Sequence, residues 1–346
     1  MSLVSAYNEW DPLEEVIVGS AIGARVPRAE RSILSIDYHE IGDPAALPSG
    51  PYPKDVVDQT EEELEQFCTA LAGLGITVRR PAPSDPDAVL RTPLWETDGY
   101  YDHAPRDTVL VVGDLLIEAP MVIRGRALKQ ALYRDLMLEY FHSGARWIAA
   151  PRPRLADETY RPELPEGQRL ANLEPVFDAA NVLRVGTDLL YLVSDGGNEL
   201  GARWLQEAVG PQYTVHPCGG LYTAAHVDTT IVPLRPGLVL LNPERVTEEN
   251  LPEIFASWDK IWCPELVDIG FAGPAPVNSV WIGMNLLSLS PDLVVVERRQ
   301  VGLIKELEDK GIDVLPLPLS HARTFGGGFH CATLDVRRRG TLESYR

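Results

Sequence analysis

One pattern of strands and helices recurs along the chain and constrains its fold more than any other feature. Each copy reads as a strand, a turn, a second strand, a helix and a third strand. The four complete copies are strands 108–112 and 115–118, helix 126–141 and strand 146–149; strands 181–185 and 189–193, helix 197–208 and strand 213–216; strands 229–234 and 238–241, helix 247–258 and strand 260–263; and strands 280–284 and 293–296, helix 300–310 and strand 313–316.

The two ends of the chain supply a fifth copy. Strand 332–336 lacks partners, which are present as strand 13–19, helix 60–73 and strand 76–79. Thr60 and Glu63 form a capping box that predicts the start of that helix. Units stacked in a ring bury a continuous core. The sequence therefore predicts one α/β domain over residues 1–346, a five-bladed pseudosymmetric α/β propeller closed between its terminal strands; a generic α/β fold with hairpins is the alternative.

A reactive or polar residue stands just before the first strand of each unit. These residues are Asp107, Asp178, Asp228, Ser279 and Cys331. From 178 onward the intervals are 50, 51 and 52 residues, whereas 107 to 178 spans 71. The excess matches the Pro-rich segment 150–170, which we interpret as an insertion; segment 37–54, also rich in proline, is expected to be a loop or flap. Equivalent positions in a ring converge, so we expect these five side chains to meet at one end.

Cys331 is placed like a nucleophile. It follows Gly326, Gly327 and Gly328, which let another molecule or backbone approach closely, and it opens a strand. The alternative is a tight turn in which Cys331 is a small buried hydrophobic residue. The glycines do not follow the GxGxxG dinucleotide fingerprint and precede no helix.

The other residues at this end complete a nucleophilic site. His226 and Asp228 are two apart, and hence on one side of an extended segment. Asp178 can accept the other imidazole N–H of His226 and raise its basicity. Asp107 and Asp228 remain spare; they would raise the thiol pKa above its usual value of about 8.5 unless the substrate is a cation. A planar guanidinium fits, because a carboxylate binds its fork bidentately.

Two other classes of site compete with this interpretation. His226, Asp228, Asp178 and Cys331 could ligate zinc, but HExxH and paired-Cys spacings are missing from the sequence. A non-catalytic arginine-binding module would use the same carboxylates without the thiol.

Composition limits the partners and the compartment. The formal charge is −19, which argues against nucleic acid and anionic membranes and suits cationic small molecules. The four cysteines are scattered, as expected for reduced thiols. The first ten residues are too polar for a signal peptide, and apolar runs stay well short of a membrane span. We therefore expect a cytoplasmic protein.

Several long strings resemble the amidinotransferase family over nearly the whole chain, and most closely its aminocyclitol branch. They are NEWDPL (8–13), PRD (105–107), EPVFDAA (174–180), HVD (226–228), NPER (242–245) and GGGFHCATLDVRR (326–338). The resemblance implies a five-bladed α/β propeller, arginine as the amidino donor, no metal or organic cofactor and a homodimer. One departure is Ala104, where that branch has cysteine, which leaves acceptor choice open.

The resemblance also implies roles for individual residues. Cys331 matches the nucleophile, His226 the acid/base and Asp178 its partner. Asp107 and Asp228 match the carboxylates that hold the guanidinium. Arg245 matches an arginine that binds a substrate carboxylate in the glycine enzyme, and Tyr101 and Ser279 match pocket positions more loosely.

The expected activity is transfer of the amidino group of L-arginine to the amine of an aminocyclitol phosphate of the scyllo-inosamine 4-phosphate type, as in streptomycin-type antibiotic biosynthesis. L-Ornithine leaves, and a ping-pong mechanism passes through an amidino-cysteine. Glycine or lysine as the acceptor, or an arginine-deiminase-like hydrolase of the same fold, are the alternatives. For the acceptor phosphate, Arg25, Arg28 and Arg31 are candidates, against the simpler interpretation of an exposed basic loop.

Overall fold

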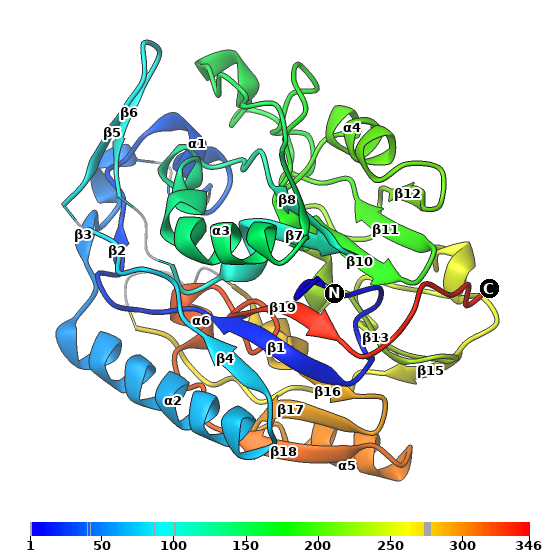
Figure 1. Cartoon of the computed structure of the whole chain (residues 1–346). Coiled ribbons are helices and arrows are strands. Elements are labelled where there is room, and N and C mark those ends of the chain that lie inside the picture. The colour runs from blue at the N-terminus through cyan, green and yellow to red at the C-terminus, as the bar shows by residue number, and fades with distance from the viewer. Residues whose placement is uncertain (1, 40, 42, 86, 100–101, 273–277) are drawn as a thin grey trace.

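Five three-stranded sheets form the framework of the computed structural model, which describes residues 2–39, 41, 43–85, 87–99, 102–272 and 278–346 (Figure 1). In each sheet the first two strands are antiparallel and the third is parallel to the second. The sheets are β19 (Thr333–Arg338), β1 (Leu13–Val18) and β4 (Thr77–Arg79); β7 (Val109–Val112), β8 (Leu115–Glu118) and β9 (Arg146–Ala149); β10 (Val182–Val185), β11 (Asp188–Leu192) and β12 (Thr214–Cys218); β13 (Ile231–Arg235), β14 (Leu238–Leu241) and β15 (Asp259–Trp262); and β16 (Leu287–Ser290), β17 (Leu293–Glu297) and β18 (Asp313–Leu317).

The ring closes between segments from opposite ends of the chain. Figure 1 shows the red strand β19 beside the blue strand β1, and the two pair antiparallel. The predicted fivefold α/β propeller is therefore confirmed.

Helices connect the second and third strands of four blades. They are α2 (Lys54–Gly73), α3 (Arg134–His142), α4 (Glu199–Val209) and α5 (Val301–Asp309). The prediction of a helix at 247–258 is wrong, because the helical structure in that range is limited to a 3-10 turn, Glu253–Phe255. Pro252 lacks an N–H and disfavours the helical conformation of the residue before it.

Two other predicted boundaries are also wrong. Helix α2 begins at Lys54 rather than Thr60, and the Thr60 hydroxyl donates to the Val56 carbonyl within the helix. Glu63 instead accepts from Ser320, so the apparent capping box serves a tertiary contact. Residues 280–284 form a 3-10 turn rather than a strand, because a short buried apolar run does not distinguish the two.

Smaller elements surround one end of the ring. They are α1 (Arg31–Ser35), α6 (Ala322–Phe325), the pair β2 (Arg25–Val26) and β3 (Gly50–Pro51), and the hairpin β5 (Val89–Arg91) and β6 (Glu96–Asp98). The predicted loop 37–54 thus contains β3 and a 3-10 turn, Pro44–Ala46. The segment 150–170 packs Leu155 and Tyr160 into the core, and its origin as an insertion stays a prediction. Across the described ranges, helices long and apolar enough to cross a bilayer are absent.

The hydrophobic core lies between neighbouring blades. Successive side chains of a strand point to opposite faces, so each sheet can contact two neighbours. On β7, Val109 and Val111 pack with β1 and β19, whereas Leu110 and Val112 pack with β10 and β11. Equivalent clusters fill the other three junctions. This arrangement explains why the strands are near-continuous apolar runs.

A buried ionic network ties the first strands of the blades together. The Arg184 guanidinium on β10 donates to Glu9 at 2.9 and 2.8 Å and to Asp335 of β19 at 2.5 Å. Arg106, before β7, and Arg338 also pair with Asp335. Burial opposes ionisation of Asp335, but the three guanidiniums hold its carboxyl pKa well below the usual range.

Replacing Arg184 with methionine should lower the free energy of unfolding by about 3–5 kcal/mol, because Glu9 and Asp335 would keep buried charges without their main partner. Thermal and urea unfolding followed by circular dichroism would measure it. Arg203→Met, on the exposed face of α4, is the matched control, with a change within about 0.5 kcal/mol. Equal stabilities of the two variants would contradict a structural role for this network.

Candidate active site

Short 3-10 turns precede the first strands and carry the predicted site residues. They are Pro105–Asp107, Ala179–Asn181, Val227–Thr229 and Val280–Met284. The first three turns contact one another in succession, and the third contacts the fourth. Asp107, Asp178 and Asp228 therefore gather at one end of the ring.

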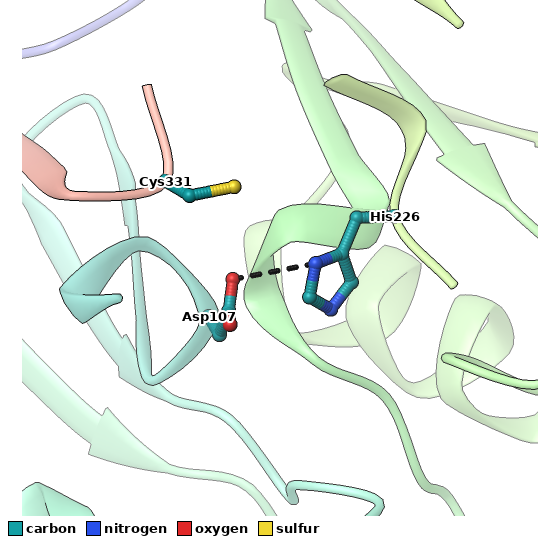
Figure 2. A group of neighbouring side chains, drawn as sticks. All are labelled: Asp107, His226 and Cys331. Atoms are coloured by element: carbon teal, nitrogen blue, oxygen red, sulfur yellow. Dashed lines mark ion pairs between the residues drawn. The ribbon is translucent and has the colours of Figure 1, made fainter. Parts of the chain in front are cut away.

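Cys331, His226 and Asp107 meet there. One donor atom from each, including the Cys331 sulfur, lies within 4.8 Å of the others. Figure 2 shows the thiol, carboxylate and imidazole facing one another from three different blades. The structure thus brings together residues that lie far apart in the sequence, as the ring predicts.

Two carboxylates hold His226 as an imidazolium. Its Nε2 lies 3.1 Å from Asp178 Oδ2, and its Nδ1 lies 3.5 Å from Asp107 Oδ1. Asp178 can accept the Nε2–H, and the Asp107 carboxylate lies beside Nδ1 at ion-pair distance, so the site favours the doubly protonated ring. Burial lowers the pKa of His226, but Asp107, Asp178 and Asp228 outweigh it and raise the pKa to about 9. At neutral pH this imidazole is an acid with a proton to give.

The Cys331 thiol is protonated in the absence of a cation. Its Sγ lies 3.1 Å from Asp228 Oδ2, and burial together with the Asp228 and Asp107 charges raises the thiol pKa well above its usual value. The Asn285 amide opposes this, because its Nδ2 donates to Sγ at 3.3 Å. A cation bound beside the sulfur would favour the thiolate.

The glycines before Cys331 are required by close approach. A Cβ on Gly327 would lie 2.7 Å from the Cys331 Cβ, and one on Gly328 would lie 2.7 Å from the Asn285 carbonyl oxygen. Gly326 adopts a φ of 77°, which disfavours other residues. The glycines therefore allow the loop to hold the Cys331 thiol in contact with Asn285.

A cavity of about 450 Å³ opens above this cluster. Asp107 and His226 line it, together with Arg126, Arg245, Ser279 and Arg323. Tyr38 and Phe325 form an apolar part of the cavity wall. The arrangement offers a nucleophile, an acid and carboxylates to a small polar cation.

Comparisons with known proteins assign this site to a family, although no family model matches the chain. The inosamine-phosphate amidinotransferase 1 of Streptomyces glaucescens is 63% identical over 347 residues, covering 100% of both chains. The L-arginine:L-lysine amidinotransferase of Pseudomonas savastanoi pv. phaseolicola is 40% identical and covers 99% of this chain and 97% of its own.

The solved inosamine-phosphate amidinotransferase from Streptomyces griseus matches with a TM-score of 0.99 and 62% identity, over 100% of this chain and 99% of that one. The chain belongs to the amidinotransferase family. It is an enzyme of the amidino-transferring class, and the predicted resemblance is confirmed.

Asp107 and Asp228 of this amidinotransferase are not the unpaired carboxylates that the sequence predicts, because both have partners within the protein. Asp107 Oδ2 pairs with Arg126, and Asp228 Oδ2 accepts from His330 Nδ1 at 2.8 Å. Asp107 Oδ1 is nevertheless buried without a hydrogen-bond partner, so it can still accept from a guanidinium. Asp228 sits in a 3-10 turn rather than the expected extended segment.

Sequence reasoning missed Arg126, Asn285 and His330 as members of the site. Arg126 pairs with both Asp107 and Asp178, and it ends a 3-10 turn, Arg124–Arg126, at the point where the sequence predicts the start of a helix. Asn285 ends the turn that was predicted as a strand. In the sequence, the position of His330 next to Cys331 is the feature that could have identified it as a site residue. Tyr101, a predicted pocket residue, lies outside the described residues.

The donor set fits a metal ion poorly. Asp107, His226 and Cys331 could reach one ion. However, the Arg126 guanidinium sits on Asp107 and the imidazole is held as a cation, so a divalent ion would meet two positive groups. One thiol with carboxylates is also an unusual zinc site.

Replacing Asp228 with asparagine should speed alkylation of Cys331 by iodoacetamide at pH 7.5 by about tenfold, because removing the negative charge beside the sulfur lowers the thiol pKa. Peptide mass spectrometry would resolve Cys331 from the other thiols. Asp114→Asn, at an exposed turn, is the control. Unchanged or slower labelling of Cys331 would show that Asp228 does not raise its pKa.

Extended dialysis against EDTA should leave turnover within about 20% of the untreated value, because the site charges already balance without an ion. The rate would be followed as ornithine release, with zinc measured by atomic emission. Loss of activity that added Zn²⁺ restores would reverse this assignment.

Proposed function

We propose that this amidinotransferase moves the amidino group of L-arginine to the amine of an aminocyclitol phosphate of the scyllo-inosamine 4-phosphate type and releases L-ornithine. One observation carries the proposal: the Cys331 thiol shares a buried acidic site with His226 and Asp107, and these two residues line a polar cavity. The relatives named inosamine-phosphate amidinotransferase supply the acceptor class, because they share 62–63% identity over the full chain.

Arginine binding prepares the nucleophile. The guanidinium places its positive charge beside the sulfur, where Asp107 Oδ1 and Asp228 accept its N–H groups. That charge lowers the thiol pKa, so Cys331 releases its proton to solvent only when the donor is present. The raised thiol pKa of the free enzyme thereby protects the sulfur from other electrophiles.

Transfer then proceeds in two halves. The thiolate attacks the guanidinium carbon, an S–C bond forms, and the bond from carbon to Nε breaks as His226 gives Nε its proton. Ornithine departs and leaves an amidino group on Cys331. The acceptor amine attacks the same carbon, neutral His226 takes its proton, and the C–S bond breaks to restore the thiolate.

Asp178 and Arg126 position the acid in this scheme. Asp178 holds Nε2, so the other ring nitrogen faces the reacting atoms beside Asp107. Arg126 neutralises the carboxylate of Asp178 that would otherwise bind the imidazolium too tightly. The segment 37–54 contributes Asp37, Tyr38 and His39 to the cavity wall, and we infer that it covers bound substrate.

The covalent intermediate provides the decisive test. Incubation with arginine alone should add the mass of one amidino group to the Cys331 peptide and release one equivalent of ornithine. Cys331→Ala should bind arginine but show no adduct and a turnover reduced by about 10⁴-fold or more. An unmodified Cys331 with undiminished turnover would refute the mechanism.

Products distinguish transfer from hydrolysis. Ornithine together with an amidino-aminocyclitol phosphate supports the proposal, whereas citrulline and ammonia would indicate the hydrolase alternative. A panel of inosamine phosphate, glycine and lysine would rank the acceptors by kcat/KM.

A further inference from the structure

Arg245 is a half-buried cation that forms no ion pair with a carboxylate among the described residues, although Glu244 and Glu166 are near enough to oppose the lowering of its pKa. Its Nη1 donates to Thr229 O at 3.1 Å, Thr229 Oγ1 at 2.8 Å and Thr230 Oγ1 at 3.0 Å, all of them neutral acceptors. Its guanidinium carbon lies 3.6 Å from the centre of the Tyr222 ring. Burial lowers the pKa of this guanidinium, so the folded protein holds its charge at a cost.

The other two arginines that line the cavity differ from Arg245. Arg126 pairs with Asp107 and Asp178. Arg323 pairs with Asp268 and donates to the Asn278 carbonyl oxygen. Both positive charges are therefore compensated by carboxylates, and the cavity presents Arg245 as the cation held ready for an anion.

The positions proposed earlier for the acceptor phosphate are also occupied. Arg25 pairs with Asp98, Arg28 with Glu96, and Arg31 donates to the Tyr160 carbonyl oxygen. These three do not line the cavity among its described residues. The N-terminal arginines thus hold their segment against strand β6 and the segment 150–170.

The two substrates of the proposed reaction share one pattern. In ornithine the δ-amine and the carboxylate carbon are about 6 Å apart when the chain is extended. In a cyclohexane ring with an amine and a phosphate on opposite carbons, nitrogen and phosphorus are about 7 Å apart. Each molecule is therefore an amine with an anion at nearly the same distance, and each must place its nitrogen at the carbon carried by Cys331.

We propose that Arg245 binds both anions in turn: the carboxylate of arginine and ornithine in the first half-reaction, and the phosphate of the acceptor in the second. The proposal rests on the proposed function. The family resemblance links Arg245 to a substrate carboxylate, and its use by the acceptor phosphate is the new step. Because one rigid cation serves both, ornithine must leave before the acceptor can bind.

The threonine contacts make this sharing feasible. Nη1 is fixed by Thr229 and Thr230. Within the described part of the chain, the one hydrogen bond of Nη2 is to Ser279 Oγ at 3.5 Å, which is too long for a strong bond. Nη2 can therefore donate to either anion without moving the side chain. Ser279 lines the same cavity and can donate its hydroxyl to the same anion.

Single-turnover kinetics would test the sharing. Each variant is loaded with arginine until mass spectrometry shows complete amidino-Cys331, desalted, and mixed with inosamine phosphate or its dephosphorylated form. In the wild type the phosphorylated acceptor should react faster. Arg245→Gln should lower kcat/KM for arginine loading and for the phosphorylated acceptor by about ten- to a hundredfold each, and remove the preference for phosphate.

Variants separate this outcome from a general defect. Arg245→Lys should recover part of both rates, and the dephosphorylated acceptor should react with loaded Arg245→Gln at the wild-type rate. Arg203→Gln, on exposed α4, controls for loss of a surface charge. Arg323→Gln should keep the preference for the phosphorylated acceptor.

Two results would overturn the proposal. If Arg245→Gln slows arginine loading but keeps the phosphate preference, the phosphate binds elsewhere, and loss of the preference in Arg323→Gln would place it there. If the wild type loads arginine but does not use the phosphorylated acceptor, the proposed acceptor class fails, which is distinct from failure of the shared cation.

Discussion

The compensation of buried carboxylates is the constraint on which the site depends. Glu9, Asp107, Asp178 and Asp228 lie within one end of the ring, where each would be costly without a cation. Arg184, Arg126 and His226 supply cations to Glu9, Asp107 and Asp178, and His330 Nδ1 lies 2.8 Å from Asp228. The Asp228 and Asp107 carboxylates still act on Cys331, so its thiol stays protonated until a substrate cation arrives.

The propeller makes that balance possible by bringing short turns from different blades to one point. Each blade contributes one polar side chain before its first strand. The strand itself is held in position because both of its faces pack against apolar residues of the neighbouring blades. The chemistry is thus carried by turns, whereas the stability is carried by the sheets between them. His330 joins the two, because it contacts both Asp228 and Glu9.

Repetition made the fold and the approximate site predictable from the sequence. The near-equal spacing of Asp178, Asp228, Ser279 and Cys331 indicated which residues converge, without knowledge of any contact. The partners of those residues could not be predicted in the same way. Arg126 ends one 3-10 turn and Asn285 follows another, and the local sequence of these turns resembles helix or strand. The charge pairing of Asp107 depends on distances that spacing does not encode.

The pairing of β19 with β1 has a consequence for biosynthesis of the enzyme. Strand β1 is made before the other four blades, whereas its antiparallel partner β19 and Cys331 are made after them. Until β19 has been made, the emerging chain lacks a closed ring and the Cys331 thiol, and it exposes the unpaired edge of β1. The ring closes, and the Cys331 thiol joins the site, when the same segment is made. Unfinished chains therefore cannot modify guanidines, and they lack the cooperative stability of the closed ring.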